Sequence, residues 1–466
     1  MPRTVAVVGA GAAGLVVARE LLREGLDVAV FEKSARTGGT WAYDPRADAD
    51  PLGRDPAAPG AVHGSLYASL RTNLPRELMG FSDFPMAGRV FAGDPRAFPG
   101  HREVLAFLDA FAEESGVLER VRLRSEVLRV APLGGQGERW AVAWRGEDGE
   151  VAEDVFDAVV VCNGHWTVPQ VAKIRGIDNW KGKQMHSHNY RVPDPFRDQV
   201  LLLCLLESIL AVMKISSIPV CHALSAECCC CRNGSQWNGH SSRDLTCGKG
   251  SAHCVEVLGG QAWKSRAPQR YLDAQRDCIQ DDGKIHFSEG SAVAADIILY
   301  CTGYYYHFPF LDLDGLTVDD NRVGPLYKHI FPPKYAPNLS FVGLPMKTIV
   351  FQSVELESKW VAAVLSGRAT LPSEEDMMAA VRDHYLQMEE EGRPKRHTHV
   401  IMPKWEEHMN WLADQVGEPR LEAWRLEMLE KAIRCAWSLD AGYRDRWEQE
   451  DNSGKSALKH PLGSKL

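Results

Sequence analysis

Short apolar runs alternate with glycine-rich turns and helical stretches at the start of the chain. Residues 4–8 are β-branched and apolar, which predicts a buried strand. Residues 15–24 have the spacing of a helix, and Gly25 follows them in a position where helices commonly end. Residues 27–32 predict a second strand. The opening of the chain is therefore typical of a strand–helix–strand unit with parallel strands.

The alternation of strands and helices continues along the chain. Three more continuous apolar runs predict buried strands, and each ends in a turn: 158–162 before Asn163-Gly164, 295–300 before Thr302-Gly303, and 339–342 before Gly343. Residues 121–130 and 140–144 alternate apolar and polar positions like half-buried strands, whereas 101–115 has helical spacing. From about residue 373 onward, helical spacing predicts a helical C-terminal region over 373–466. The pattern predicts the α/β class.

The turn after the first strand carries the glycine pattern Gly9-Ala10-Gly11-Ala12-Ala13-Gly14. Between a strand and a helix, such glycines permit a tight turn, close approach of a pyrophosphate and close helix–strand packing, and a helix N-terminus favours phosphate. Glu32 ends the second strand, where a carboxylate accepts hydrogen bonds from ribose hydroxyls and repels a 2′-phosphate. The arrangement predicts FAD or NAD rather than NADP, and the alternative is a tight turn without a ligand.

A second glycine turn, Gly38-Gly39-Thr40-Trp41, follows Glu32 closely. A second place where the backbone can pass close to a ligand suits an extended cofactor and therefore favours FAD. Trp41 either covers the flavin or packs as an ordinary aromatic residue, and the sequence leaves both interpretations open.

Composition is ordinary for a globular protein and excludes disordered, collagen-like and coiled-coil chains. The 466 residues are 45% hydrophobic and 25% charged, and this length predicts two or three domains. The formal net charge of −9 argues against a nucleic-acid partner, because such proteins are more often basic. The most apolar stretch, 200–213, is interrupted by Glu207 and Ser208 and is shorter than the roughly 20 residues of a membrane span, so no transmembrane segment is expected.

Two further features concern the compartment and the cysteine content. The chain ends in Ser464-Lys465-Leu466, the peroxisomal import tripeptide, which predicts the peroxisome, with the cytoplasm as the alternative. Both compartments are reached without secretion, so structural disulfides are not expected. Eight of the twelve cysteines nevertheless crowd between Cys204 and Cys254.

Several further motifs lie apart in the chain. They are LYASLRTN at 66–73, VVCNGHW at 160–166, YCTGY at 300–304, PNLSFVGLP at 337–345, ELESKW at 355–360, and a pattern formed by Trp180, Gly182, His186, Ser187 and Tyr190. In combination they resemble the flavin-containing monooxygenases, most closely the plant S-oxygenase type linked to glucosinolates, over about 1–199 and 284–400. Trp180 stands where the family pattern usually has Phe. Tyr190 favours this family over Baeyer–Villiger monooxygenases, whose pattern ends in Trp.

The resemblance implies a fold and a chemistry. The fold would have two dinucleotide-binding, Rossmann-like domains: an NADPH domain over 164–295 inserted into a discontinuous FAD domain over 1–163 and 296–372. NADPH would reduce FAD, O₂ would add to give a C4a-hydroperoxide, and a soft nucleophile would take one oxygen atom. The expected substrate is a small thioether, with an amine as the second choice, and no metal is expected.

The resemblance also assigns residues to the site. Asn73 matches the family's active-site Asn, whose amide donates and accepts at once and would hold the hydroperoxide or the NADP⁺ that protects it. The alternative is that Asn73 caps a turn before Leu74-Pro75. His186 is a motif residue without a catalytic role. The residues assigned to the cofactor are Gly9, Gly11, Ala12, Ala13, Gly14, Glu32, Lys33, Gly39, Thr40, Trp41 and Thr302.

Residues 200–283 depart from the family. A strand and a second glycine turn for NADPH should follow Gln199, yet the chain has nothing resembling them, and no GxGxxG occurs between Val200 and Gly283. Four adjacent cysteines do not fit the paired spacing of structural zinc sites. No C-x-x-C lies next to a strand–helix–strand unit, as a redox motif would require.

The genetic code supports a third interpretation of this segment. Codons for 228–240 can be chosen that, read one base on, give VVVVGMGPSGTD, a strand followed by a glycine turn. We therefore hypothesise that residues 200 to about 254 are partly intron and partly out-of-frame translation. Lys264 and Arg266 then remain as a basic pair for a 2′-phosphate or as ordinary surface charges. The alternatives to an active enzyme of this type are an FAD-binding protein impaired in catalysis and a Baeyer–Villiger or auxin-type relative.

Overall fold

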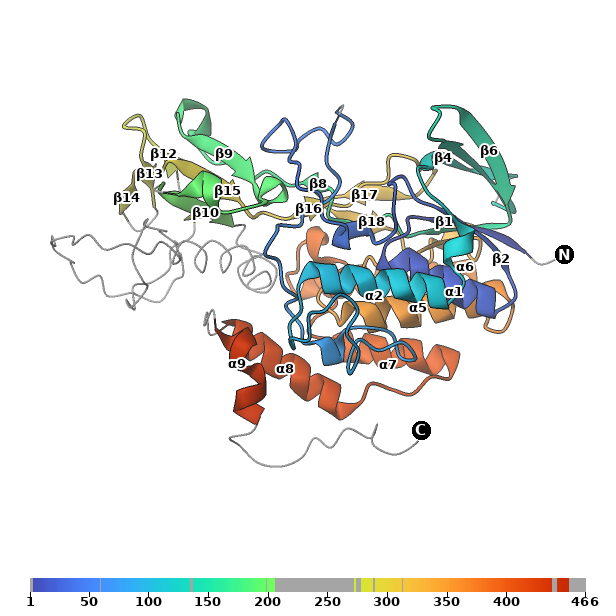
Figure 1. Cartoon of the computed structure of the whole chain (residues 1–466). Coiled ribbons are helices and arrows are strands. Elements are labelled where there is room, and N and C mark those ends of the chain that lie inside the picture. The colour runs from blue at the N-terminus through green and yellow to red at the C-terminus, as the bar shows by residue number, and fades with distance from the viewer. Residues whose placement is uncertain are drawn as a thin grey trace.

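The computed structural model describes residues 3–58, 60–134, 137–197, 199–205, 272–273, 278–287, 290–311, 313–437 and 442–451 (Figure 1). Most of the cysteine-rich segment, with Lys264 and Arg266, lies outside these residues. The C-terminal tripeptide Ser464-Lys465-Leu466 lies outside them as well. What the sequence suggested about those parts stays a prediction.

Five parallel strands form the central sheet, in the order β19-β7-β1-β2-β3. They are β1 (Thr4–Val8), β2 (Asp27–Phe31), β3 (Val121–Arg122), β7 (Ala158–Val161) and β19 (Leu339–Phe341). Strands far apart in the chain are therefore neighbours, and the predicted strands at 4–8, 158–162 and 339–342 are confirmed. The α/β class is confirmed with them.

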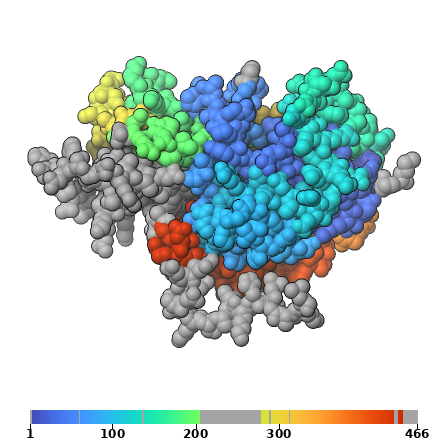
Figure 2. All heavy atoms as spheres, viewed as in Figure 1, coloured from blue at the N-terminus to red at the C-terminus, as the bar shows by residue number. Residues whose placement is uncertain are grey.

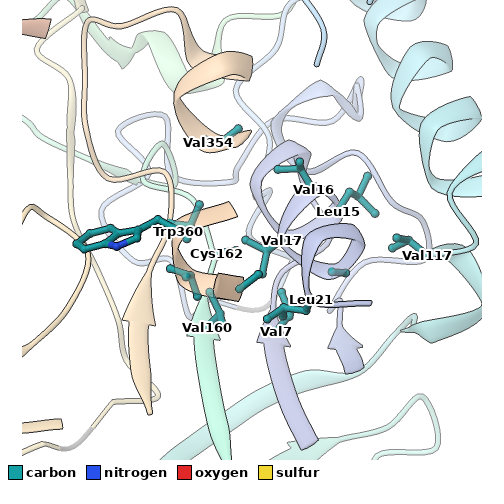
Figure 3. Packing of buried hydrophobic residues seen from close by; sticks show 14 of the residues in the cluster. Val7, Leu15, Val16, Val17, Leu21, Val117, Val160, Cys162, Val354 and Trp360 are labelled. Carbon is teal, nitrogen blue, oxygen red and sulfur yellow. The ribbon is translucent and has the colours of Figure 1, made fainter. Parts of the chain in front are cut away.

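Side chains alternate between the two faces of this sheet, so each face has its own core. Val7 and Val160 point to one face, where α1 (Ala12–Arg23), α2 (His101–Glu114) and α5 (Val350–Leu365) cover the sheet (Figure 3). The opposite face, which includes Ala6 and Val8, packs against an antiparallel sheet. That sheet consists of β4 (Glu126–Leu133), β5 (Arg139–Arg145) and β6 (Val151–Phe156).

A second parallel sheet has the order β11-β10-β15-β9. Its strands are β9 (Lys183–His186), β10 (Leu201–Leu205), β11 (Leu272–Asp273) and β15 (Ile297–Tyr300). β15, which begins at Ile297, pairs with β9 and β10 in this sheet, and the predicted domain bounds stay a prediction. The expectation that no strand follows Gln199 was wrong. The apolar run of β10, with Leu201–Cys204 at most 1% exposed, occupies the middle of this sheet whatever residues follow it.

The remaining strands are short. They are β8 (Val168–Pro169) with β16 (Tyr304–Tyr305), β12 (Cys278–Ile279) with β13 (Ile285–His286) and β14 (Ala292–Val293), and β17 (Thr317–Asp319) with β18 (Arg322–Gly324). The loop between Asp44 and Gly64 is tied to the residues that follow β9, since Arg191 donates to the carbonyls of Asp44 and Gly64. Figure 2 shows this loop in blue, between the second sheet in green and the antiparallel sheet in teal.

The predicted helical C-terminal region is confirmed over the residues that the structure describes. It contains α6 (Glu374–Glu390), α7 (Trp405–Val416), α8 (Ala423–Trp437) and α9 (Tyr443–Asp451). The N-cap of α6 is Ser373, whose hydroxyl accepts a hydrogen bond from Asp376 N at 3.1 Å. Within the described residues, no helix is both long and apolar enough to cross a membrane.

Short 3₁₀ turns complete the fold. They are η1 (Gly39–Trp41), η2 (Arg76–Leu78), η3 (Leu118–Arg120), η4 (Ile177–Asn179), η5 (Ser187–Asn189), η6 (Asp194–Phe196), η7 (Pro333–Tyr335) and η8 (Lys395–His397). The first of them matters for function, because it carries the second glycine turn beside the end of β1.

Candidate active site

The first glycine turn joins β1 to α1, and two of its glycines are required by the fold itself. Gly9 has a φ of +104°, and a Cβ there would lie 2.6 Å from the carbonyl oxygen of Cys162. A Cβ on Gly14 would overlap the carbonyl oxygen of Gly9. Gly11 is different: its φ is −80°, and a Cβ would meet only the backbone of Gly39, at 3.5 Å or more. Space at Gly11 is therefore not used by the protein's own packing.

The two glycine turns touch each other backbone to backbone. Gly38 N donates to the Ala10 carbonyl at 2.9 Å. Gly38 and Gly39 have φ values of +113° and +53°, which glycine adopts without strain. A Cβ on Gly39 would lie 2.8 Å from the Cα of Gly11. The second turn thus forms one wall beside the first, with Thr40 and Trp41 in η1 and Trp41 packed against the core of the central sheet.

Glu32 fixes the edge of this cradle. It is only 7% exposed, and its two carboxylate oxygens accept hydrogen bonds from Ala10 N and Ser34 N, each at 2.8 Å. Each oxygen keeps a second lone pair, which can accept from a ribose hydroxyl. Lys33, the next residue, has an exposed side chain beside this carboxylate. The cradle therefore fits a dinucleotide without a 2′-phosphate on its ribose, and FAD is such a dinucleotide.

The first turn of α1 is open to an anion. Its N-cap, Gly11, has no side chain that could satisfy the free N–H groups of the helix, and such groups are a common phosphate site. Ala12 and Ala13, both with small and partly buried side chains, form this turn. From the other side, Gly343 follows β19 and lies so close to Ala13 that a Cβ on it would be 3.4 Å from the Ala13 methyl.

Glu357 holds Gly343 in this position, and sequence reasoning had not singled it out. The side chain of Glu357 is fully buried on α5, and its Oε2 accepts from Gly343 N at 2.8 Å. Ser353 Oγ donates to Oε1 at 3.1 Å. Burial raises the pKa of Glu357 to about 7, although these two hydrogen bonds oppose the shift. In the sequence Glu357 was part of the ELESKW motif at 355–360, to which no role was assigned.

Asn73 lies on a loop whose backbone is well fixed. Thr72 N donates to the Pro99 carbonyl at 2.9 Å, and Arg71 donates to the Phe98 carbonyl and pairs with Asp445 of α9 at 2.6 Å. The half-buried amide of Asn73 makes no hydrogen bond with the residues that the structure describes. The structure thus contains no turn cap formed by this side chain, and the amide is available to a ligand.

The family motif residues lie together around the linker between the two parallel sheets. Trp180 is 7% exposed, and its indole covers Gly182, where any Cβ would overlap the ring. His186 is fully buried, and its Nδ1 accepts from His188 N at 3.0 Å. Burial lowers the pKa of His186 to about 3, so the ring is neutral near pH 7. These contacts give the spacing of the motif a packing reason.

Two more of the predicted residues, Tyr190 and Thr302, are buried near the segments that join the two parallel sheets. Tyr190 is 1% exposed and lies against Tyr67 and Phe196, with ring centroids 5.4 and 5.5 Å apart. Thr302 is fully buried, and its hydroxyl donates to the carbonyl of Gln170. This hydrogen bond ties the residue after β8 to the segment before β16, and the assignment of Thr302 to the cofactor stays a prediction.

The fold and this site define a flavoprotein class: a dinucleotide cradle on one parallel sheet, and a second parallel sheet joined to it by two segments of the chain, one containing β8 and the other β16. The chain belongs to the flavin-binding monooxygenase family. A family model described as "Flavin-binding monooxygenase-like" matches residues 2–217 and 279–437. The family resemblance seen in the motifs is therefore confirmed.

Individual relatives are similar over nearly the whole chain. Flavin-containing monooxygenase FMO GS-OX-like 2 of Arabidopsis thaliana is 46% identical over 455 residues, which cover 96% of this chain and 92% of that protein. FMO GS-OX5 of the same plant is 45% identical over 455 residues, with 96% and 92% covered. The solved structure of S-allyl-L-cysteine S-oxygenase from Allium sativum is 44% identical with a TM-score of 0.82, and 97% of each chain is covered.

Proposed function

We propose that this protein is an FAD- and NADPH-dependent monooxygenase that transfers one oxygen atom from O₂ to a thioether sulfur. The observation that carries the proposal is the pair of glycine turns beside the first turn of α1: Gly11 has space that the protein's own packing does not use, and Gly39 forms the adjoining wall. The similarity to an S-allyl-L-cysteine S-oxygenase supports sulfur over nitrogen as the acceptor. Oxygenation of an amine is the second outcome to test.

The protein's own residues bind and orient the reactants. The N–H groups of the first turn of α1 would hold the pyrophosphate, and Glu32 would accept from the ribose hydroxyls. Glu357 would position the Gly343 turn against this cradle through its hydrogen bond to Gly343 N. FAD, when bound, supplies the redox chemistry and the activation of O₂.

Asn73 is the proposed active-site amide. An amide can donate one hydrogen bond and accept another without changing its protonation state between pH 5 and 9. The two residues before Asn73 are held by the Thr72 N–H and the Arg71 side chain, so the free amide needs little ordering when a ligand arrives. The proposed role of the amide is to hold, by hydrogen bonds, the part of the bound cofactor that delivers oxygen, and to orient the substrate toward it.

A second candidate function is an FAD-binding protein that NADPH cannot reduce. The observation that favours it is the absence from the sequence of any GxGxxG between Val200 and Gly283. Strand β10 provides the sheet position from which such a turn would start, and the residues that follow Leu205 lie outside the described part. This candidate predicts normal flavin content without turnover.

One experiment separates these candidates. The purified protein is mixed anaerobically with NADPH and the flavin absorbance is followed, and then air and a thioether, an amine or a ketone are added. Bleaching followed by sulfoxide formation supports the main proposal. Bound flavin that does not bleach supports the impaired protein, and conversion of the ketone alone would establish a Baeyer–Villiger activity instead.

A further inference from the structure

The turn between β19 and α5 borders the cofactor cradle at one end. It begins at Gly343, which lies against Ala13, and it ends at Ile349, the residue before α5. In an open parallel sheet, ligands bind outside the carboxyl ends of the strands, and this turn starts at the carboxyl end of β19. Lys347 lies in the middle of the turn.

Lys347 is an ammonium without a counter-charge. Its side chain is half-buried, and it makes no hydrogen bond or ion pair with the residues that the structure describes. Its backbone has a φ of +63°, a left-handed conformation that is uncommon for a residue with a side chain. Burial lowers the pKa of Lys347 to about 7. A half-buried ammonium that has no counter-charge among the described residues can take an anionic ligand as its partner.

The charged groups near Lys347 are mostly positive, and the one carboxylate among those described below is paired with an arginine. His397 lies close enough to interact with Lys347: burial, Arg396 and Lys347 together lower the pKa of His397 to about 4. The nearby carboxylate, Asp320, faces Arg396 at 3.9 Å. Arg393 adds a further positive charge on His397. His399, which accepts at its carbonyl from Met346 N at 2.7 Å, is also neutral, because burial lowers its pKa to about 3.

The same turn meets the loop that carries Asn73. Ile349 is 1% exposed and packs in one hydrophobic cluster with Leu78, which follows Asn73 by five residues. Leu74, next to Asn73, packs against this cluster too. Lys347 and Asn73 therefore belong to two segments that pack together on the cofactor side of the central sheet.

We propose that Lys347 binds the carboxylate of an anionic thioether substrate. The inference rests on the proposed function, and it narrows the substrate class to thioethers that carry a carboxylate. An ammonium donates up to three hydrogen bonds, and a charged hydrogen bond of this kind changes binding by about 10- to 100-fold. A phosphate of a cofactor shares this chemistry, and the experiment below distinguishes the two sources.

The test compares S-allyl-L-cysteine with its methyl ester, which keeps the sulfur and the amine but removes the carboxylate charge. In Lys347→Met, the ratio of kcat/KM for the acid over the ester is expected to fall about 10- to 100-fold. Lys347→Arg should restore most of the ratio. Equilibrium binding of the acid to the FAD-loaded protein should weaken by the same factor, and this readout does not need turnover.

Lys328 provides the matched control. It is also half-buried with a left-handed backbone, at a φ of +52°, but its ammonium lies 4.5 Å from the centre of the Trp411 ring. Lys328→Met should leave the acid-to-ester ratio unchanged. An unchanged acid-to-ester ratio in Lys347→Met would overturn the proposal. Equal losses of kcat/KM for acid and ester, with a raised KM for NADPH, would overturn it too and would assign Lys347 to a cofactor phosphate. Wild-type protein that oxidises neither compound yet binds the acid through Lys347 would refute the proposed function alone.

Discussion

The substitution Gly11→Ala should separate cofactor binding from folding. The new methyl group would meet only Gly39, at 3.5 Å or more, and the φ of −80° suits alanine. Alanine lowers the entropy of the unfolded chain, which stabilises by about 0.4–1 kcal/mol, but it is a poorer N-cap residue than glycine by a similar amount. The free energy of unfolding of the apoprotein should therefore change by less than about 1 kcal/mol.

Binding of FAD should respond much more strongly. The methyl group would occupy the space through which the pyrophosphate reaches the N–H groups of α1. Hydrogen bonds to charged groups contribute about 1.5–3 kcal/mol each, so the loss of two costs about 3–6 kcal/mol. At about 1.4 kcal/mol per factor of ten, the Kd for FAD should rise roughly 10²- to 10⁴-fold.

Two measurements check this prediction. Urea unfolding of the apoprotein gives the stability, and titration with FAD, followed by flavin fluorescence, gives the Kd. Gly14→Ala is the control, because its methyl group would overlap the Gly9 carbonyl and should destabilise the apoprotein itself. The reasoning is refuted if Gly11→Ala binds FAD within about tenfold of the wild type, or if it unfolds as readily as Gly14→Ala.

Three further predictions concern contacts that hold the site. Glu357→Leu leaves Gly343 N without its partner, which should lower the free energy of unfolding by about 1–3 kcal/mol and lower the flavin content. Glu357→Gln keeps an acceptor and should change the stability in urea little, so equal losses in both variants would contradict a role through this hydrogen bond. Gly182→Ala should destabilise by about 1–3 kcal/mol in thermal unfolding, because the methyl group displaces the Trp180 indole, and an unchanged Tm would exclude this packing role. Acid should destabilise the protein through His186 and His399, because burial lowers the pKa of both to about 3 and the unfolded chain therefore binds more protons than the folded one. The stability is fully present above about pH 6.5, and the free energy of unfolding falls by about 2 kcal/mol per histidine by pH 5. The result would contradict this sign if the urea midpoint of the wild type stayed constant between pH 7 and 5 while that of a variant without both imidazole rings dropped.

Much of the cofactor cradle was predictable because its determinants are local. A strand, a glycine turn and a helix follow one another within the first 25 residues, and a backbone that needs a φ of +104° at Gly9 permits almost nothing but glycine. Glu32 was found by its distance from that turn. Strand β10 was not predicted, because no glycine turn follows Gln199 in the sequence, yet the apolar run at Leu201–Leu205 is sufficient for a strand.

Residues that act through distant partners could not be found in this way. Glu357 and Gly343 are 14 positions apart on different elements, and only the packing of α5 against the central sheet brings the carboxylate to the Gly343 N–H. The hydrogen bond from the Thr302 hydroxyl to the carbonyl of Gln170 also joins residues 132 positions apart, and the sequence alone did not indicate it. Burial, which sets the pKa values of Glu357 and Lys347, is likewise a property of the whole fold.

The sequence by itself determined the class of this protein, since periodicity and turn chemistry are written into neighbouring residues and specify strands, helices and a dinucleotide cradle. Only the tertiary structure decided which polar groups stay without a partner. The amide of Asn73 and the ammonium of Lys347 are chemically ordinary in the sequence. They become candidates for function because segments far apart in the chain surround them and, among the described residues, give them no hydrogen-bond or charge partner.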